Sequence, residues 1–289
     1  MGRNGSHRQA STVLLVASLT LVVPQLASSQ STLVLHLPFD DGSGFDIAAD
    51  TSGNGLDGTL VNMDTTTDWV SGMAGLALDF DGSNDYVSVP DDAALDFGTG
   101  DFSVLVWVYK HSTTTNFDNT YAVSKWVSGA NPGSNEWGLL VGSGQGGDNA
   151  VFVVETGDDR YGMASLQELT LNEWHQIVGV RRAETLSLYV DGTLAGRDSS
   201  LPPLSAINNV GRHLRVAVNQ PGHVIFYTEG LFDDVQIYNF ALDDGGVVVG
   251  QAAGGDIEFL YANPGVTLQI FKDGFEFGDT TGWAHTLSP

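Results

Sequence analysis

The amino-acid sequence predicts an all-β protein, a sandwich or jelly roll of two antiparallel sheets, and three observations support this class. About a dozen short apolar runs alternate with turn-forming residues, a pattern typical of sandwiches. The 289 residues include 36 glycines, which suit tight turns. The acidic residues are 27 aspartates and 8 glutamates, and aspartate favours turns whereas glutamate more often occurs on helices.

Composition also excludes several classes of protein and site. The chain has no cysteine, so it has neither disulfides nor thiolate metal sites nor a cysteine nucleophile. Its formal charge of −24 argues against nucleic acid as a partner, because neutralising phosphates requires a basic surface. The same charge disfavours docking on anionic lipid. We therefore expect any additional staple of the fold to be a metal held by oxygen atoms.

Residues 1–29 have the features of a secretory signal peptide. They contain Arg3 and Arg8 but no acid, then an apolar run over residues 12–23, then small residues at 27–29. The apolar run is too short to span a bilayer comfortably. We expect cleavage after Ser29 and an exported protein, either secreted or associated with the cell surface. No later segment is apolar enough to predict a transmembrane segment, and the sequence does not indicate the oligomeric state.

Strands are predicted at regular intervals through the first half of the mature chain. Residues 81–85 (DGSND) give a hairpin signal between two of them. Within residues 102–110, valines at alternate positions face one side and larger apolar residues face the other, so we expect both faces to be covered. The predicted strands are residues 33–38, 76–80, 86–89, 102–110, 121–127, 136–141 and 150–155.

The second half continues this pattern and then changes. Asp191-Gly192 predicts a tight hairpin turn between two strands. The predicted strands are residues 174–181, 186–190, 193–196, 214–218, 223–228 and 232–238. Beyond Gly254 the composition changes, so we interpret residues 254–289 as a tail or small appendage with a strand at residues 266–271.

Four stretches of the chain form an ordered set of motifs. They are LHLPFD (35–40) leading to DTSGNG (50–55), ALDFDGSNDYV (77–87), EWH (173–175) leading to LYVDG (188–192), and FDDVQIYN (232–239). In this order they resemble bacterial laminin-G-like domains of the concanavalin A-like lectin/glucanase superfamily. The resemblance implies that residues 30–253 form a jelly roll of two curved antiparallel sheets. It also implies a family of many carbohydrate- and protein-binding modules. Residues 273–283 are similar to a short acidic-aromatic C-terminal motif of secreted proteobacterial proteins.

The expected function is a secreted noncatalytic module that binds a glycan or an extracellular protein. Laminarinase-type enzymes on this fold carry two glutamates flanking an aspartate on one strand, and this chain has no such motif among its scattered glutamates. It also lacks a nucleophile elbow and a zinc-binding helix motif. Two alternatives remain open: a polysaccharide-degrading hydrolase or lyase with an atypical site, and a purely structural exoprotein.

Three aromatic residues are candidate ligand-binding residues. Trp126, Trp137 and Tyr161 lie in or beside polar, glycine-rich loops, near Asn131, Asn135, Asp158 and Arg160. Sugars stack their apolar faces on such rings, while amide and carboxylate groups bind their hydroxyls. The alternative is that Trp126 and Trp137 belong to the core of their strands.

The resemblance also implies a structural Ca²⁺. Many relatives hold one between the end of the first strand and a late strand, where the ligand is an aspartate four residues before an aromatic. The matching positions here are Asp40, Asp234 with Tyr238 following, and a turn carbonyl at Gly82. Oxygen ligands of this kind suit Ca²⁺. The alternative is that Asp40 and Asp234 are simply turn and strand-end acids of an acidic surface.

Overall fold

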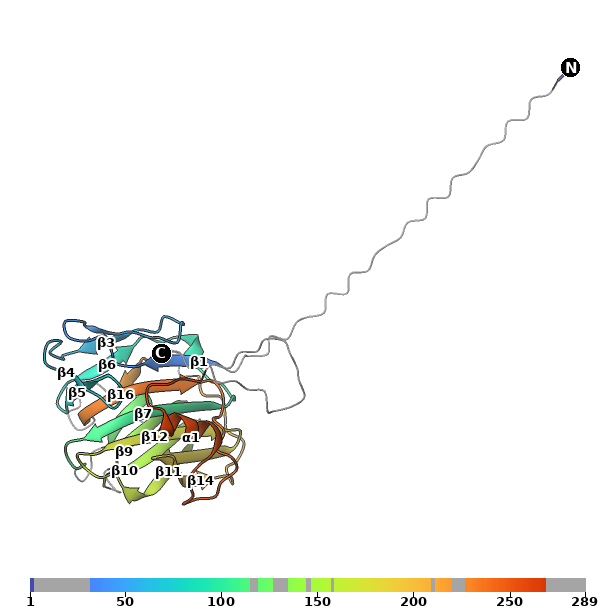
Figure 1. Cartoon of the computed structure of the whole chain (residues 1–289). Coiled ribbons are helices and arrows are strands. Elements are labelled where there is room, and N and C mark those ends of the chain that lie inside the picture. Colours follow the sequence, from blue (N-terminus) through green and yellow to red (C-terminus); the bar gives the residue numbers. More distant parts are fainter. Residues whose placement is uncertain are drawn as a thin grey trace. The chain divides into compact units, whose positions relative to one another are not determined.

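The computed structural model describes residues 1–2, 32–114, 119–126, 135–143, 147–156, 159–208, 211–219 and 227–268. All described strands lie in the compact unit Ser31–Pro289 (Figure 1). The predicted signal peptide beyond its first two residues and the predicted C-terminal motif lie outside the described residues. In the part of the chain that the structure describes, no helix is long and apolar enough to cross a membrane.

The strands form two antiparallel sheets of eight strands each, which confirms the predicted sandwich. Sheet A has the order β14-β13-β12-β7-β16-β5-β4, and β1 also pairs with β16. Its strands are β1 (Leu33–Leu37), β4 (Trp69–Ser71), β5 (Leu76–Asp81), β7 (Phe102–Lys110), β12 (Trp174–Arg182), β13 (Thr185–Val190), β14 (Thr193–Asp198) and β16 (Glu229–Tyr238).

Sheet B has the order β11-β10-β9-β8-β15-β6-β3-β2. Its strands are β2 (Ile47–Ala48), β3 (Gly58–Val61), β6 (Tyr86–Val89), β8 (Thr120–Lys125), β9 (Glu136–Gly142), β10 (Asn149–Thr156), β11 (Asp159–Glu168) and β15 (Leu214–Val216). A short 3₁₀ helix, Ala93–Leu95, follows β6.

The main core lies between the two sheets. Phe102 of sheet A and Phe152 of sheet B meet there with their ring centres 5.8 Å apart. At Gly179, an added Cβ would fall 2.4 Å from the Phe152 ring, so the sheets approach most closely where a side chain is absent. The two-sided strand predicted at residues 102–110 is confirmed, because Val104 joins this core whereas Trp107 joins a second cluster on the outer face of sheet A.

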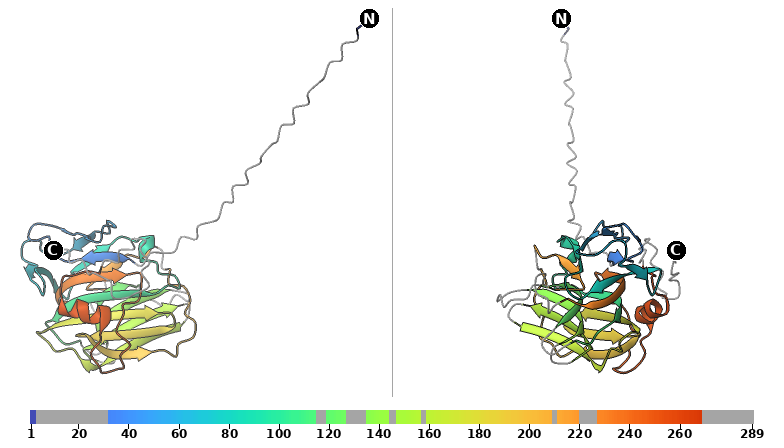
Figure 2. Two further views of the ribbon diagram at one scale, coloured as in Figure 1. Left: turned by 45° about the vertical axis from the view of Figure 1, so that its right-hand side comes forward. Right: turned by 90° about the vertical axis from the view of Figure 1, so that its left-hand side faces the viewer.

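That second cluster is closed by the chain beyond the last strand. The helix α1 (Gly255–Ala262) lies against sheet A outside the sandwich (Figure 2). Its buried residues Ile257 and Leu260, together with Leu268, pack on the sheet. We expected residues 254–289 to form a tail or small appendage; within that segment, residues 254–268 cover part of the outer face of sheet A.

Several local features differ from the prediction, among them the short strands β2, β3 and β4, which were not predicted. Residues 266–268 form no strand, and residues 269–271 lie outside the described residues. The strand β11 was not predicted, because glycine and alanine at Gly162 and Ala164 interrupt the apolar alternation of this edge strand.

Candidate functional site

The outer face of sheet B carries aromatic and charged side chains at β9 and its neighbours. In β9, Trp137 and Leu139 point into the core between the sheets. Successive side chains of a strand point to opposite faces, so Glu136 and Leu140 point outward. Leu140 accordingly packs in a small cluster on this outer face.

Trp126, the residue after β8, lies at the centre of this outer cluster. It is 5% exposed and packs against Tyr121, Leu140 and Val153. The guanidinium carbon of Arg160 lies 4.8 Å from the centre of the Trp126 ring. Because a cation over an indole face is attracted by the ring, this contact holds the Arg160 side chain against the sheet.

Tyr121 adds a hydroxyl group to the same cluster. Burial raises the pKa of this hydroxyl, and the positive charge of Arg160 and hydrogen bonds with Asn219 and Arg160 oppose the rise. Asn219 is 1% exposed, and its Oδ1 has no hydrogen-bond partner among the described residues. Buried polar atoms are normally hydrogen-bonded, so an unpartnered amide oxygen here marks a place for bound water or ligand.

Beside this cluster, the outward side of β11 is exposed along its length. It presents Arg160, Gly162, Ala164 and Leu166, and Leu166 is 86% exposed. A Cβ added at Gly162 would meet nothing closer than 3.6 Å, and the atoms it meets belong to the adjacent strand β10. These four residues, here called the β11 strip, form an accessible surface next to the Trp126–Arg160 pair.

Two glutamates also face each other on this surface. Glu136 in β9 lies opposite Glu155 in β10, and Glu155 lies opposite Arg160 in β11. Glu155 is half-buried, and Glu136 is 2% exposed. Like charges directly opposite each other destabilise a sheet, so Arg160 offsets part of this cost. Sequence spacing could not reveal this pair, because the two residues meet only through strand pairing.

The three aromatic residues predicted to bind ligand do not meet on one surface. Trp126 lies on the outer face, as described. Trp137 is fully buried between the sheets, so we exclude it from the candidate ligand site. Tyr161 in β11 and Trp137 in β9 both lie opposite Val154 of β10, one on each side of that strand. Tyr161 packs against the same core as Trp137. Its neighbour Arg160, which points to the other face, is the β11 residue that reaches Trp126.

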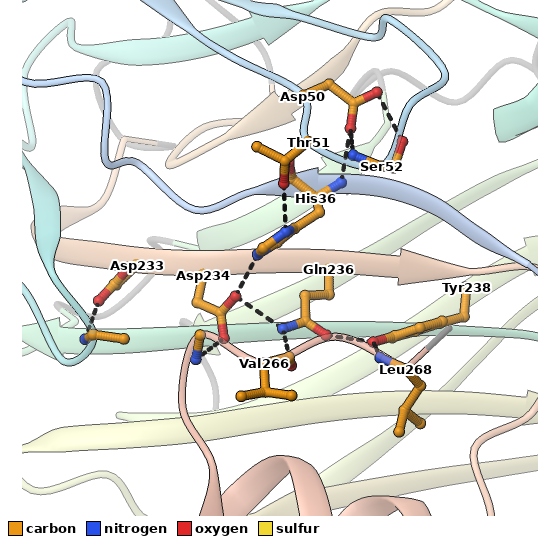
Figure 3. Close-up of polar contacts among 12 residues, drawn as sticks. His36, Asp50, Thr51, Ser52, Asp233, Asp234, Gln236, Tyr238, Val266 and Leu268 are labelled. Atoms are coloured by element: carbon orange, nitrogen blue, oxygen red, sulfur yellow. Dashed lines mark hydrogen bonds and ion pairs between the residues drawn. The ribbon is translucent and has the colours of Figure 1, made fainter. Parts of the chain in front are cut away.

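A second polar cluster lies at a bulge of β16, between its pairing with β5 and its pairing with β1. Asp234 occupies this bulge with a φ of 51° (Figure 3). Its Oδ1 lies 2.8 Å from Nε2 of His36 and accepts a hydrogen bond of 2.8 Å from Gln236. Its Oδ2 accepts the Gly265 N–H at 2.9 Å. Protein groups therefore engage both oxygens of Asp234.

Asp233 and Asp40 instead bind the turn between β4 and β5. Asp233 Oδ2 accepts the Ala74 N–H at 2.9 Å, and Asp40 Oδ1 accepts the Leu76 N–H at 2.7 Å. Asp233 is fully buried, and within the part of the chain that the structure describes its Oδ1 has no hydrogen-bond partner. Burial raises the pKa of Asp233 to about 7; the Ala74 N–H opposes the rise, and the charge of Asp234 adds to it.

Gly82 lies at the other end of β16, where an added Cβ would fall 2.7 Å from Cβ of Glu229. Each strand residue advances about 3.3 Å, and Asp234 is five residues beyond Glu229. The structure therefore does not bring Gly82 together with Asp40 and Asp234. Among the described residues, no three or more His, Cys, Asp or Glu side chains group as metal ligands.

Comparisons with known proteins agree with this architecture. A family model described as concanavalin A-like lectin/glucanases superfamily matches residues 81–248. Domain 4 of AbnA, a GH43 extracellular arabinanase from Geobacillus stearothermophilus solved in complex with arabinotriose, is 20% identical with a TM-score of 0.55. That match covers 73% of this chain and 94% of the AbnA domain.

Toxin binding domains share the fold as well. The binding domain of Paraclostridial Mosquitocidal Protein 1 is 18% identical, with a TM-score of 0.56, over 80% of this chain and 52% of that one. The botulinum neurotoxin serotype D binding domain is 14% identical, with a TM-score of 0.51, over 80% and 51% of the two chains. At these identities the likeness shows the fold alone. No curated protein matches the chain.

The fold is therefore a jelly roll of lectin-like, carbohydrate-binding type, with its strands in two antiparallel sheets. The family match spans more than half of the chain, from β5 to the residues after β16. The protein belongs to the concanavalin A-like lectin/glucanases superfamily.

Proposed function

We propose that this protein is an exported, noncatalytic glycan-binding module whose ligand lies over the β11 strip. The observation that carries the proposal is the Trp126–Arg160 pair beside an exposed run of small residues. The guanidinium of Arg160 offers several N–H donors, and the carboxylate of Glu155 accepts, so together they suit sugar hydroxyls. The arabinotriose complex of the AbnA domain supports a glycan rather than a protein as the ligand.

The charge of the protein narrows the class of glycan. With a formal charge of −24, the chain repels polyanions over long distances. A neutral polysaccharide carries no such penalty, and its hydroxyls need both donors and acceptors. We therefore propose a neutral glycan as the ligand.

A polysaccharide panel tests this proposal. The purified full chain is run on affinity gels of neutral polysaccharides and on a glycan array, as wild type, Arg160→Ala and Arg182→Ala. Arg182 is an exposed arginine of sheet A, so its loss matches the change in charge. Hydrogen bonds to charged groups contribute about 1.5–3 kcal/mol, so we expect Arg160→Ala to weaken binding about tenfold to a hundredfold. Unchanged affinity in Arg160→Ala, or capture of an extracellular protein but no glycan, would contradict the proposal.

Hydrolysis is the second candidate function, and the opposed glutamates favour it. Retaining glycosidases hold two carboxyl groups about 5–5.5 Å apart, and directly opposed residues have Cβ atoms at about 4.5–5.5 Å. Glu136 is only 2% exposed, however, and this burial favours binding over hydrolysis. Release of reducing ends by wild type but not by Glu155→Gln would establish hydrolysis in place of simple binding.

Export is proposed from the sequence of residues 1–29 alone. Mass spectrometry of the exported protein should show a start near Gln30. An intact Met1 on soluble exported protein would refute a cleaved signal peptide.

A structural Ca²⁺ remains a proposal, with its carboxylates reassigned. Asp234 has both oxygens engaged, whereas Asp233 has a buried oxygen without a partner, which a cation would satisfy. We propose Asp40 and Asp233 as the carboxylates, completed by main-chain carbonyls of residues 72–76 and by water. Bound Ca²⁺ would neutralise two acids in an acidic protein and fix the turn between β4 and β5.

Melting curves with millimolar Ca²⁺ and with chelator test this site. A ligand in hundredfold excess over its Kd stabilises by about 2.7 kcal/mol. We expect Asp233→Asn to lose the response to Ca²⁺ and Asp234→Asn to keep it. Identical melting of the wild type in Ca²⁺ and chelator would exclude a structural Ca²⁺.

A further inference from the structure

Lys110, the last residue of β7, extends from sheet A into the interior of the sandwich. It continues the inward-facing series of Val104 and Val108 and is 3% exposed. Its Nζ donates hydrogen bonds of 2.9 Å to the Val141 carbonyl in sheet B and 2.9 Å to Thr114 Oγ1. The amine of one sheet is thus held at the backbone of the other.

The third partner of this amine is a buried carboxyl group. Nζ of Lys110 contacts Oδ1 of Asp148, which is 6% exposed and directly precedes β10. The Thr114 N–H also donates to that oxygen, at 2.7 Å, and fixes the carboxyl group. Burial lowers the pKa of Lys110, and Asp148 opposes this, so the neutral amine is more accessible than in an exposed lysine.

A second acid lies beside this pair. Glu168 ends β11 opposite Asn149, the residue after Asp148. A Cβ added at Gly147 would fall 2.3 Å from Glu168 Oε1, so the carboxylate lies over the residue that precedes Asp148. Glu168 is exposed to solvent and also acts on the charge of Lys110. The amine, the carboxyl group and an exposed glutamate therefore lie at one end of the sandwich.

We propose that Lys110 and Asp148 condense into an intramolecular amide that joins sheet A to the start of β10 in sheet B. A proton first passes from Nζ of Lys110 to the carboxylate of Asp148 within the ion pair; the neutral amine then attacks Cγ of Asp148, so the Nζ–Cγ bond forms and one Cγ–O bond breaks. Glu168 takes a proton from the attacking nitrogen and returns one to the departing hydroxyl, which leaves as water. The reaction needs no oxidant and consumes the ion pair. It gives a cysteine-free chain a covalent staple, where composition alone suggested only a metal.

A second buried lysine provides an internal comparison. Lys125 is fully buried, and its Nζ lies 2.7 Å from Asp96 and 2.9 Å from Asp91. Burial raises the pKa of Asp91. The hydrogen bonds that Asp91 accepts from Lys125 and from the Gly211 N–H outweigh this effect, so the pKa of Asp91 is lowered overall. Because Lys125 is shared between two carboxylates, loss of its proton would leave both acids without a cation, so this ion pair is harder to neutralise than that of Lys110. We expect Lys125 to remain an ion pair.

Mass spectrometry of the denatured full chain tests the proposal. The measured mass of the Asp148→Ala variant, corrected for the substitution, gives the mass expected of a wild type without the amide. We expect the measured mass of the wild type to be lower than this by one water. Trypsin should fail to cleave after Lys110, cleave after Lys125, and release the Lys110 peptide joined to the peptide containing Asp148. Glu168→Gln should retain the full mass, or lose water more slowly on incubation.

These readouts survive a loss of folding, because mass is measured on unfolded protein. A wild type that keeps its full mass after prolonged incubation, and that trypsin cleaves after Lys110, would contradict the proposal and leave an ordinary buried ion pair. Failure here leaves the proposed glycan site untouched, because Lys110 and Asp148 do not contribute to the β11 strip.

Discussion

Sheet A and sheet B bury one core between them, but their outer faces differ in how far other parts of the chain cover them. The outer face of sheet A is covered by residues after the last strand, including Leu242, Ile257, Leu260 and Leu268. The smaller apolar cluster on sheet B consists of residues from β8, β9 and β10 with Trp126, and the neighbouring β11 strip is exposed. A sandwich has two outer faces, and this chain closes one with its own C-terminal segment and leaves part of the other accessible.

The polar network above sheet A fits a closing role rather than a binding role. The hydroxyl of Tyr238 accepts the Leu268 N–H at 3.1 Å, and Gln236 donates to the Val266 carbonyl at 3.0 Å (Figure 3). With the Gly265 N–H on Asp234, these bonds tie the segment after α1 to β16. Side chains that satisfy the backbone of a covering segment are not free to bind a ligand.

The largest expected effect comes from uncovering sheet A. Leu260 is 2% exposed and packs on this sheet, so Leu260→Ala should lower the free energy of unfolding by about 2–5 kcal/mol. Urea denaturation of both proteins measures the change. Glu258→Ala on the exposed side of α1 serves as control and should change stability little. Equal small effects would mean that α1 is only an appendage, as the sequence suggested.

The sequence predicted the sandwich well, but it did not predict that residues 254–268 cover the outer face of sheet A. Alternating apolar residues identified β7 at its observed bounds, because both faces of that strand are buried. Residues 254–262 show no such pattern: Gly254 caps the helix, Gly255 begins it, and the apolar residues of the helix cover only two buried positions. Their role depends on contact with strands far away in sequence, which no local pattern reports.

The candidate site was predicted only in part for the same reason. Trp126 and Arg160 were recognised as residues of polar loops, but their contact depends on the order β8-β9-β10-β11. Trp137 was grouped with them because it too lies near glycine-rich residues; strand alternation instead turns it into the core. Glu136 and Glu155 became a pair only through the register of β9 and β10.

A pH-dependent effect is expected at the edge of sheet A. His175 at the start of β12 is 2.7 Å from Asp191 through Nδ1, and this hydrogen bond raises the pKa of His175 despite its partial burial. A raised histidine pKa stabilises the folded state below the unfolded value of about 6.5, and the gain is lost as pH rises through the folded value.

The variant Asp191→Asn tests this sign, because asparagine tolerates the positive φ of 49° at this turn. The difference in unfolding free energy between wild type and variant should be larger at pH 5.5 than at pH 8. These two pH values lie below and above the unfolded histidine pKa of about 6.5, and the direction of the pKa shift of His175 decides which of them shows the larger difference. A difference that is constant or larger at high pH would show that His175 gains nothing from Asp191 in its charged form.

The smallest effect on stability is expected on the accessible face. Arg160 is exposed, and contacts such as those with Trp126 and Glu155 contribute little at exposed sites, so Arg160→Ala should lower the free energy of unfolding by about 1 kcal/mol at most. Thermal melting of this variant beside Leu260→Ala contrasts the two faces directly. A large loss of stability in Arg160→Ala would make the Trp126–Arg160 pair a structural contact and not part of an accessible binding surface.

The central claim, that a glycan lies over the β11 strip, is tested most directly by filling the strip. Gly162→Val adds a side chain where the nearest atoms are 3.6–3.9 Å from the new Cβ, so the fold should accept it. Ser71→Val, on the exposed edge strand β4 of sheet A, is the matched control. Affinity for the retained polysaccharide should fall at least tenfold in Gly162→Val, with melting temperatures near that of the wild type, and stay unchanged in Ser71→Val. Undiminished binding by a folded Gly162→Val protein would place the ligand elsewhere and contradict the account.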